Sequence, residues 1–165
     1  MRTTPHPLAF AMASAFLVTL ASCGGSDGDD DPVVVPPTPS PITLSGTVVV
    51  DQAIQNAVVC LDLNANSACD ATEPTSAKTS ASGAYSLTYD PDTVTAARVA
   101  AASLIAPMVP GAAADVGTTV DAANPGEPNT TTAYVLRQVP GKSGQINPLT
   151  TLVATGVAAG MTETA

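Results

Sequence analysis

Side chains that carry oxygen recur at alternate positions in one short run, from Asp62 to Glu73. Counted from Asp62, they fall at the first, third, fifth, ninth and twelfth places, and a backbone carbonyl can serve at the seventh. This is the ligand spacing of a calcium-binding loop, and oxygen donors without nitrogen or sulfur favour Ca²⁺ over a transition metal. The predicted ligands are Asp62, Asn64, Asn66, the carbonyl of Ala68, Asp70 and Glu73.

Two features of this run predict weak binding. The sixth position is Ser67, where calcium loops use glycine for a sharp turn, and few of the ligands are charged. Both features favour the low affinity of an extracellular module over that of a cytosolic buffer. The alternative is a polar hairpin loop, in which Asp and Asn side chains only stabilise the turn by hydrogen-bonding its backbone.

Cys60 and Cys69 flank the same run. We predict a disulfide between them, because they are the even pair that remains if Cys23 carries a lipid in an oxidising compartment. A bridge that closes so short a loop adds about 2 to 3 kcal/mol of stability. The alternatives are two free thiols or a thiolate metal site, for which this spacing supplies too few ligands.

The third cysteine, Cys23, follows a typical export leader. Residues 1–22 combine a basic start, an apolar stretch from Leu8 to Leu20 and small residues before Cys23. The run 20–23 resembles the lipobox of bacterial lipoproteins, which implies cleavage before Cys23 and acylation of that residue. Gly24 follows the cysteine, and by resemblance to lipoprotein sorting this implies lipid anchoring in the outer membrane of a Gram-negative envelope.

Composition excludes several functions. The chain has 165 residues, a formal charge of -9 and a pI near 4.1. A phosphate backbone attracts basic proteins, so nucleic acid is not an expected partner. The single histidine, His6, lies in the leader, so the mature chain lacks a Ser-His-Asp or Cys-His pair and a histidine-ligated zinc site. Catalysis would then have to use carboxylates, and acidic residues at turns beside Pro and Gly are ordinarily structural, so we expect no enzyme activity.

The chain after the leader divides into a tether, a β domain and a helix. Residues 23–41 are rich in Gly, Asp and Pro and predict a disordered tether, because they cannot bury enough apolar surface to fold. Residues 42–140 alternate apolar and polar side chains over 42–50, 57–63 and 85–89, and 132–139 predicts a further strand. These short strands predict a mainly β fold, an antiparallel β-sandwich of transthyretin or immunoglobulin type.

Composition alone guides the structure predicted for two other segments. Residues 93–110 fit a helix or a strand, and we favour the strand. The composition of residues 118–129 predicts an exposed loop that could contact a ligand.

The last segment, 147–165, predicts a helix. Asn147 can cap it, with Pro148 at its first position. The helix has no stop signal before Ala165, and its apolar stripe needs a partner. We expect either that the stripe packs on the sandwich or that the segment starts a further domain of a longer protein. The stripe comprises Leu149, Leu152, Val153, Val157 and Met161.

Three runs carry a resemblance to a known family: 44–48, 56–74 and 82–87. Together they resemble the transthyretin-like, carboxypeptidase-regulatory-like β-sandwich modules of bacterial surface proteins. They are also similar to the calcium-binding B repeats of Gram-positive adhesins, whose loop pairs Asp-x-Asn-x-Asn-Gly with a later Asp and Glu. The resemblance covers about residues 42 to 90 and implies a fold more than a function, because such sandwiches serve many roles.

We therefore expect a lipid-anchored cell-envelope protein that acts as a non-catalytic binding or spacer module stabilised by calcium. It contacts the membrane through its N-terminal lipid and has an extracellular protein or glycan as a ligand. The alternative is the N-terminal accessory domain of a larger envelope enzyme, such as a hydrolase or peptidase.

Overall fold

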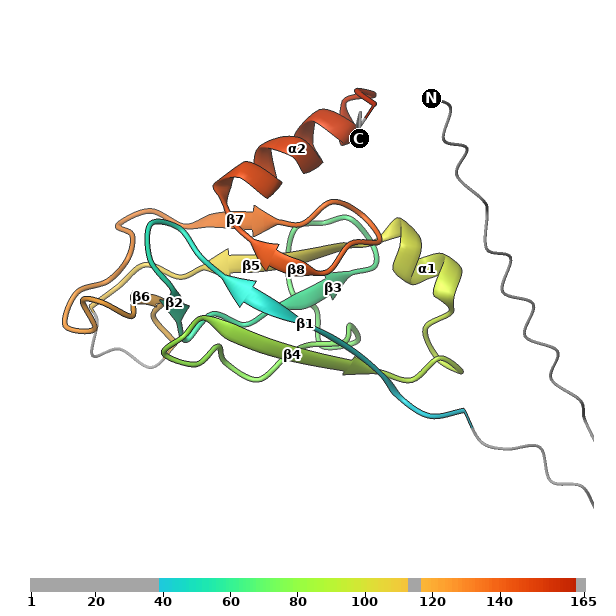
Figure 1. The fold of residues 1–165 in the computed structure, drawn as a ribbon, viewed down its shortest axis with the longest axis horizontal. Helices are drawn as coiled ribbons and strands as arrows, with labels where there is room; N and C mark the ends of the chain where they lie inside the picture. The colour runs from blue at the N-terminus through green and yellow to red at the C-terminus, as the bar shows by residue number, and fades with distance from the viewer. Residues whose placement is uncertain (1–38, 113–116, 163–165) are drawn as a thin grey trace, which may run out of the picture. The chain divides into compact units, whose positions relative to one another are not determined.

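The computed structural model of the protein describes residues 39–112 and 117–162 (Figure 1). The predicted leader, the lipidated Cys23 and most of the tether lie outside these residues. In chain order the elements are β1 (Ile42–Val48), β2 (Ile54–Gln55), β3 (Cys60–Asp62), β4 (Ala84–Tyr89), α1 (Ala96–Ala101), β5 (Ser103–Met108), β6 (Val120–Asp121), β7 (Tyr134–Arg137), β8 (Gly144–Ile146) and α2 (Pro148–Ala158).

The strands form three small sheets, so the prediction of a mainly β fold is confirmed. The strand orders are β4-β1-β8, β3-β5-β7 and β2-β6. All pairings are antiparallel except that of β1 with β8, for which the antiparallel prediction is wrong. After β7 the chain turns back and enters the free edge of β1 in the same direction as β1, which no local pattern signals.

Strand β4 has the alternation that the sequence predicts. Tyr85, Leu87 and Tyr89 are buried, and the residues between them are exposed. Leu44 of β1 lies opposite Leu87, so the two strands present apolar side chains to the same side. One half-buried sheet face of this kind follows from a period of two.

The core draws its buried side chains from both three-stranded sheets. Val48, Leu87 and Ile146 come from the sheet that contains β1. The sheet that contains β5 contributes to the same cluster, and its members there are Leu61, Leu104, Ala106, Met108 and Leu136.

The close approach of β8 to β1 requires glycine at Gly46. A Cβ atom added at Gly46 would overlap the carbonyl group of Gly144 on the neighbouring strand. The Tyr85 hydroxyl also donates a hydrogen bond to that carbonyl, at 3.0 Å. Burial raises the pKa of Tyr85, and this hydrogen bond offsets part of the rise.

The strand predicted over 57–63 is shorter than expected. Only Cys60–Asp62 pairs as a strand, with β5. Before it, the amide of Ala57 donates to the Thr79 hydroxyl at 2.9 Å, and the amide of Val59 donates to the Ser76 hydroxyl at 2.9 Å. Side-chain oxygens therefore satisfy backbone donors that a longer strand would have used.

The strand favoured over 93–110 is wrong for its first half. Thr95 caps α1, because its hydroxyl accepts a hydrogen bond from the amide of Arg98. Strand β5 follows directly after α1 and lies at the centre of its sheet. The two alternatives for this segment are thus both present, one after the other. The loop expected over 118–129 contains the two-residue strand β6.

Helix α2 begins as predicted. The Asn147 side chain accepts the amide of Thr150, the Thr150 hydroxyl accepts the amide of Asn147, and Pro148 opens the helix. The helix ends at Ala158 rather than continuing to Ala165. Gly160 adopts a φ of 89°, a left-handed conformation that stops a helix.

The prediction that the apolar stripe of α2 packs on the sheets is wrong for its largest members. Leu149, Leu152 and Met161 are 67%, 68% and 65% exposed. Threonines hold the helix instead. The Thr150 hydroxyl donates to the carbonyl of Arg137 at 2.7 Å, and the amide of Arg137 donates to the Thr151 hydroxyl at 2.8 Å. Figure 1 shows α2 beside β7.

Within 39–112 and 117–162, neither helix has the length and apolar character needed to cross a bilayer.

Candidate metal site in the disulfide-closed loop

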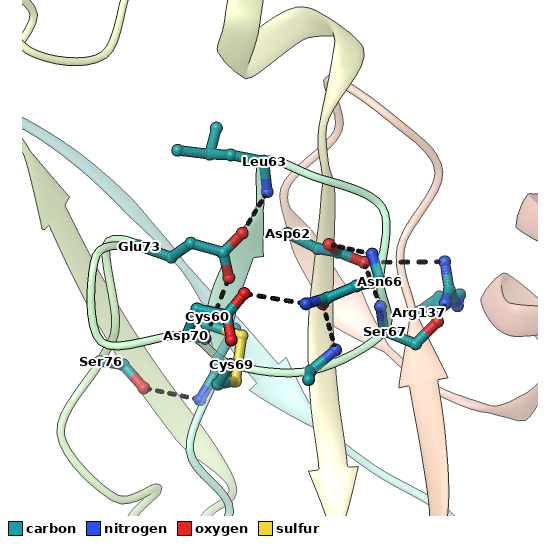
Figure 2. The surroundings of a disulfide bond; sticks show 12 residues. Cys60, Asp62, Leu63, Asn66, Ser67, Cys69, Asp70, Glu73, Ser76 and Arg137 are labelled. Carbon is teal, nitrogen blue, oxygen red and sulfur yellow. Dashed lines mark hydrogen bonds and ion pairs between the residues drawn. A yellow bond between two sulfur atoms is a disulfide. The ribbon is translucent and has the colours of Figure 1, made fainter.

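A disulfide joins Cys60 to Cys69, as the sequence predicts (Figure 2). Their Cα atoms are 5.6 Å apart. Cys60 is fully buried in β3 and pairs there with Ile105 of the central strand β5. The bridge therefore ties Cys69, inside the loop, to the protein core.

The backbone of the loop bends sharply at two residues. Ala65 has a φ of 59° and Ser67 a φ of 67°. Ser67 occupies the sixth position, where calcium loops use glycine because a side chain there is strained. The sequence thus adopts the expected turn without the expected residue.

Asp62 holds this turn from inside. Its Oδ1 accepts the amide of Asn66 and its Oδ2 accepts the amide of Ser67, each at 3.0 Å. The residue is only 3% exposed. A buried carboxylate needs such donors, because an unpaired one would cost several kcal/mol.

The two asparagines turn their side-chain oxygens and nitrogens to different partners. The Oδ1 atoms of Asn64 and Asn66 accept the amides of Asn66 and Ala68, at 3.0 and 2.8 Å. Their Nδ2 atoms both donate to Oδ2 of Asp70, at 2.7 and 2.8 Å. Two neutral amide groups therefore satisfy one oxygen of the Asp70 carboxylate by hydrogen bonding without balancing its charge.

Glu73 closes the loop from the other side. Its Oε1 accepts the amide of Leu63 at 2.7 Å, and its Oε2 accepts the amide of Asp70 at 3.2 Å. The residue is 7% exposed. One carboxylate thus links the second and ninth positions of the loop, which Figure 2 shows at the left.

Arg137 of β7 contacts the loop from a distant part of the chain. Its Nη1 lies 4.0 Å from Oδ2 of Asp62, and its Nη2 donates to the Ser67 hydroxyl. Sequence reasoning missed this residue. Arg137 stands 70 positions after Ser67, and no motif around it indicates a role.

The residues present fit a calcium ion by donor type and order. All five predicted side-chain ligands lie on this one loop, and each offers a hard oxygen. In the structure, however, these side chains are not gathered around one common centre. In the part of the chain that the structure describes, no three His, Cys, Asp or Glu side chains lie close enough together to hold a metal ion. Binding would require Asn64 and Asn66 to give up their donation to Asp70.

A cleft of about 370 Å³ lies beside the loop. It runs between the loop and the start of α1, and the exposed Arg98 stands at its edge. Its lining residues are Leu63, Asn64, Ala71, Thr72, Glu73, Pro74, Thr93, Val94 and Arg98.

The predicted contact loop, 118–129, borders a second hollow of about 280 Å³. Its lining residues are Val50, Asp51, Ile54, Asp121, Asn124, Glu127, Pro128 and Asn129. Asn129 also donates to the hydroxyl of Tyr134, and this bond offsets part of the rise in the Tyr134 pKa that burial causes.

A scan against protein-family models, a search of curated proteins and a search of solved structures each found no match to this chain. The resemblance to transthyretin-like modules and adhesin B repeats therefore stays a prediction.

Proposed function

We propose that the protein is a lipid-anchored cell-envelope protein that acts as a binding or spacer module and has no catalytic activity. The observation that carries this proposal is the Cys60–Cys69 disulfide around an oxygen-rich loop. Disulfides persist in oxidising compartments outside the cytosol, which agrees with export by the leader and an anchor at Cys23.

We propose a sandwich for the folded part. The two three-stranded sheets share one apolar core, in which Leu87 and Ile146 of one sheet join Leu61 and Leu104 of the other. Two sheets that bury their inner faces against each other define this architecture. The proposed fold is transthyretin-like, with the β1–β8 pairing as a parallel addition.

We propose that calcium stabilises the loop in the envelope. Extracellular calcium modules have dissociation constants of about 10⁻⁴ to 10⁻³ M. Such weak binding suits a loop with three carboxylates and a strained sixth residue. The support is the position of Asp62 and Glu73, which hold both ends of the loop through backbone amides.

Acidic residues elsewhere serve turns, which supports a non-catalytic role. Oδ1 of Asp90 accepts the amide of Asp92 at 2.9 Å, and Oδ1 of Asp121 accepts the amide of Ala123 at 2.8 Å. Such bonds are the ordinary structural use of aspartate in turns. The expected partner is an extracellular protein or glycan, in addition to the membrane.

Lipid labelling tests the proposed anchor. Cells that express the full chain are labelled with palmitate and partitioned in detergent. We expect label and detergent partitioning for the natural chain and neither for Cys23→Ser, with Cys60→Ser as the control that keeps the label. Equal labelling of the Cys23→Ser protein would contradict the anchor.

A second candidate function is an accessory domain of a larger envelope enzyme. The exposed Leu149 and Leu152 of α2 favour it, because large apolar side chains that share one exposed helix face commonly mark a contact surface. Reading the gene beyond codon 165 tests this candidate. An open frame that encodes a hydrolase or peptidase domain would support it, and an immediate stop codon would contradict it.

A further inference from the structure

Asp62 is the first predicted calcium ligand and is already paired with a cation. Its side chain is 1% exposed, whereas that of Arg137 is 27% exposed. The guanidinium of Arg137 lies 4.0 Å from Oδ2 of Asp62. Attraction between opposite charges is stronger in such a partly buried place than in water.

The backbone of Arg137 is held in place on two sides. Arg137 pairs with Ile105 of β5 within the sheet. On the other side its amide donates to Thr151 and its carbonyl accepts the hydroxyl of Thr150, both at the start of α2. The side chain therefore leaves from a fixed point, and its bond to the Ser67 hydroxyl directs it to the loop.

We propose that Arg137 sets the calcium affinity of the loop by competing with the ion for Asp62. This inference rests on the proposed calcium loop. A calcium ion at Asp62 meets a carboxylate whose charge the guanidinium already balances, and the two cations repel each other. The guanidinium also keeps Asp62 paired when calcium is absent, so the empty loop stays folded.

The other described cations do not have this relation to the loop. Arg98 borders the neighbouring cleft, but within 39–112 and 117–162 the ion pair of Arg137 with Asp62 is the only one formed by a loop carboxylate. Lys142 lies in the turn between β7 and β8, exposed, and makes only a backbone hydrogen bond, to Val139. Lys142 is therefore a matched control for the loss of one positive charge.

Calcium binding to three proteins tests the inference. Isothermal titration calorimetry with calcium chloride up to about 10 mM, above the range of extracellular modules, is run on the natural chain, Arg137→Gln and Lys142→Gln. We expect Arg137→Gln to bind about tenfold more tightly than the natural chain, because one nearby repulsive charge is removed. Lys142→Gln should bind within about threefold of it, since the Lys142 side chain is exposed, is screened by solvent and forms no ion pair with a loop carboxylate among the described residues.

The failures are distinguishable. If Arg137→Gln binds with the same or lower affinity than the natural chain, the inference is overturned and the calcium loop stands. If none of the three proteins binds, the calcium loop is overturned and the inference with it. If only Arg137→Gln binds, competition by Arg137 is supported in its strongest form.

A measurement on the natural chain keeps the inference testable if Arg137→Gln does not fold. In a ¹⁵N NMR titration with calcium chloride, the Nε–Hε signal of Arg137 should shift as the guanidinium leaves Asp62. Calcium-dependent shifts of the Asn66 and Ser67 amides with an unmoved Arg137 signal would overturn the inference.

Discussion

The Cα atoms of Cys60 and Cys69 lie 5.6 Å apart, and the disulfide between them joins the buried strand β3 to the eighth position of the Asp62–Glu73 loop. The bridge limits the conformations of the loop before any ion binds. A loop whose conformations are already limited loses less entropy when it orders around an ion. We therefore expect the disulfide and the proposed calcium site to stabilise the same loop together.

Removal of the disulfide should destabilise the protein. We expect Cys60→Ala/Cys69→Ala to lower the free energy of unfolding by about 2 to 3 kcal/mol, because the unfolded chain regains the freedom of a short closed loop. Urea unfolding of the variant and of the natural chain measures the difference. Equal midpoints, or thiol labelling of both cysteines in the unreduced and denatured natural chain, would contradict the bridge.

Glycine at Ala65 should stabilise the loop. Ala65 is exposed and has a φ of 59°, a conformation that costs a residue with a Cβ atom about 1 kcal/mol. We expect Ala65→Gly to raise the free energy of unfolding by about 0.5 to 1 kcal/mol.

Ala68→Gly provides the matched control for Ala65→Gly. Ala68 is also exposed in the loop and does not have a positive φ. Its replacement should leave stability unchanged or lower it by about 0.5 kcal/mol, because glycine adds freedom to the unfolded chain. If both variants shift the urea midpoint in the same direction, the left-handed conformation at Ala65 is wrong.

Stability should fall at alkaline pH through Tyr85. Burial raises its folded pKa above the ordinary value of 10.0, so the folded state holds this proton more tightly than the unfolded state. The contribution is complete below pH 10.0, and it is lost as pH rises through the folded pKa.

Unfolding by urea at several pH values measures this loss. Tyr85→Phe should be less stable at neutral pH, because it lacks the hydrogen bond to Gly144, but its stability should fall less steeply above pH 10.0. Parallel pH profiles for the two proteins would show that Tyr85 does not contribute.

The local parts of the structure could be predicted from the sequence. The alternation at Tyr85, Leu87 and Tyr89, the cap at Asn147 and the pairing of Cys60 with Cys69 each depend on residues a few positions apart. Short-range spacing carries that information, because a strand or helix repeats its faces at a fixed period.

The remaining features depend on contacts between distant segments. Strand β8 adds to β1 beside Gly46, and Arg137 reaches Asp62 from β7, a strand of the same sheet that lies much later in the chain. No spacing within either segment encodes such a contact. The apolar pattern of α2 likewise does not reveal which face contacts the sheets: Thr150 and Thr151 bond to Arg137 and Ala154 is buried. Leu149 and Leu152 are exposed.

The most direct test of the account is thermal unfolding of the protein with and without calcium. We predict that calcium chloride at about 10 mM raises the Tm of the natural chain, because an ion that binds only the folded state stabilises it. Glu127→Gln, which changes an exposed carboxylate outside the loop, should respond equally, and Asp70→Asn should respond little. An unchanged Tm for the natural chain, or an equal rise for Asp70→Asn, would contradict the calcium loop.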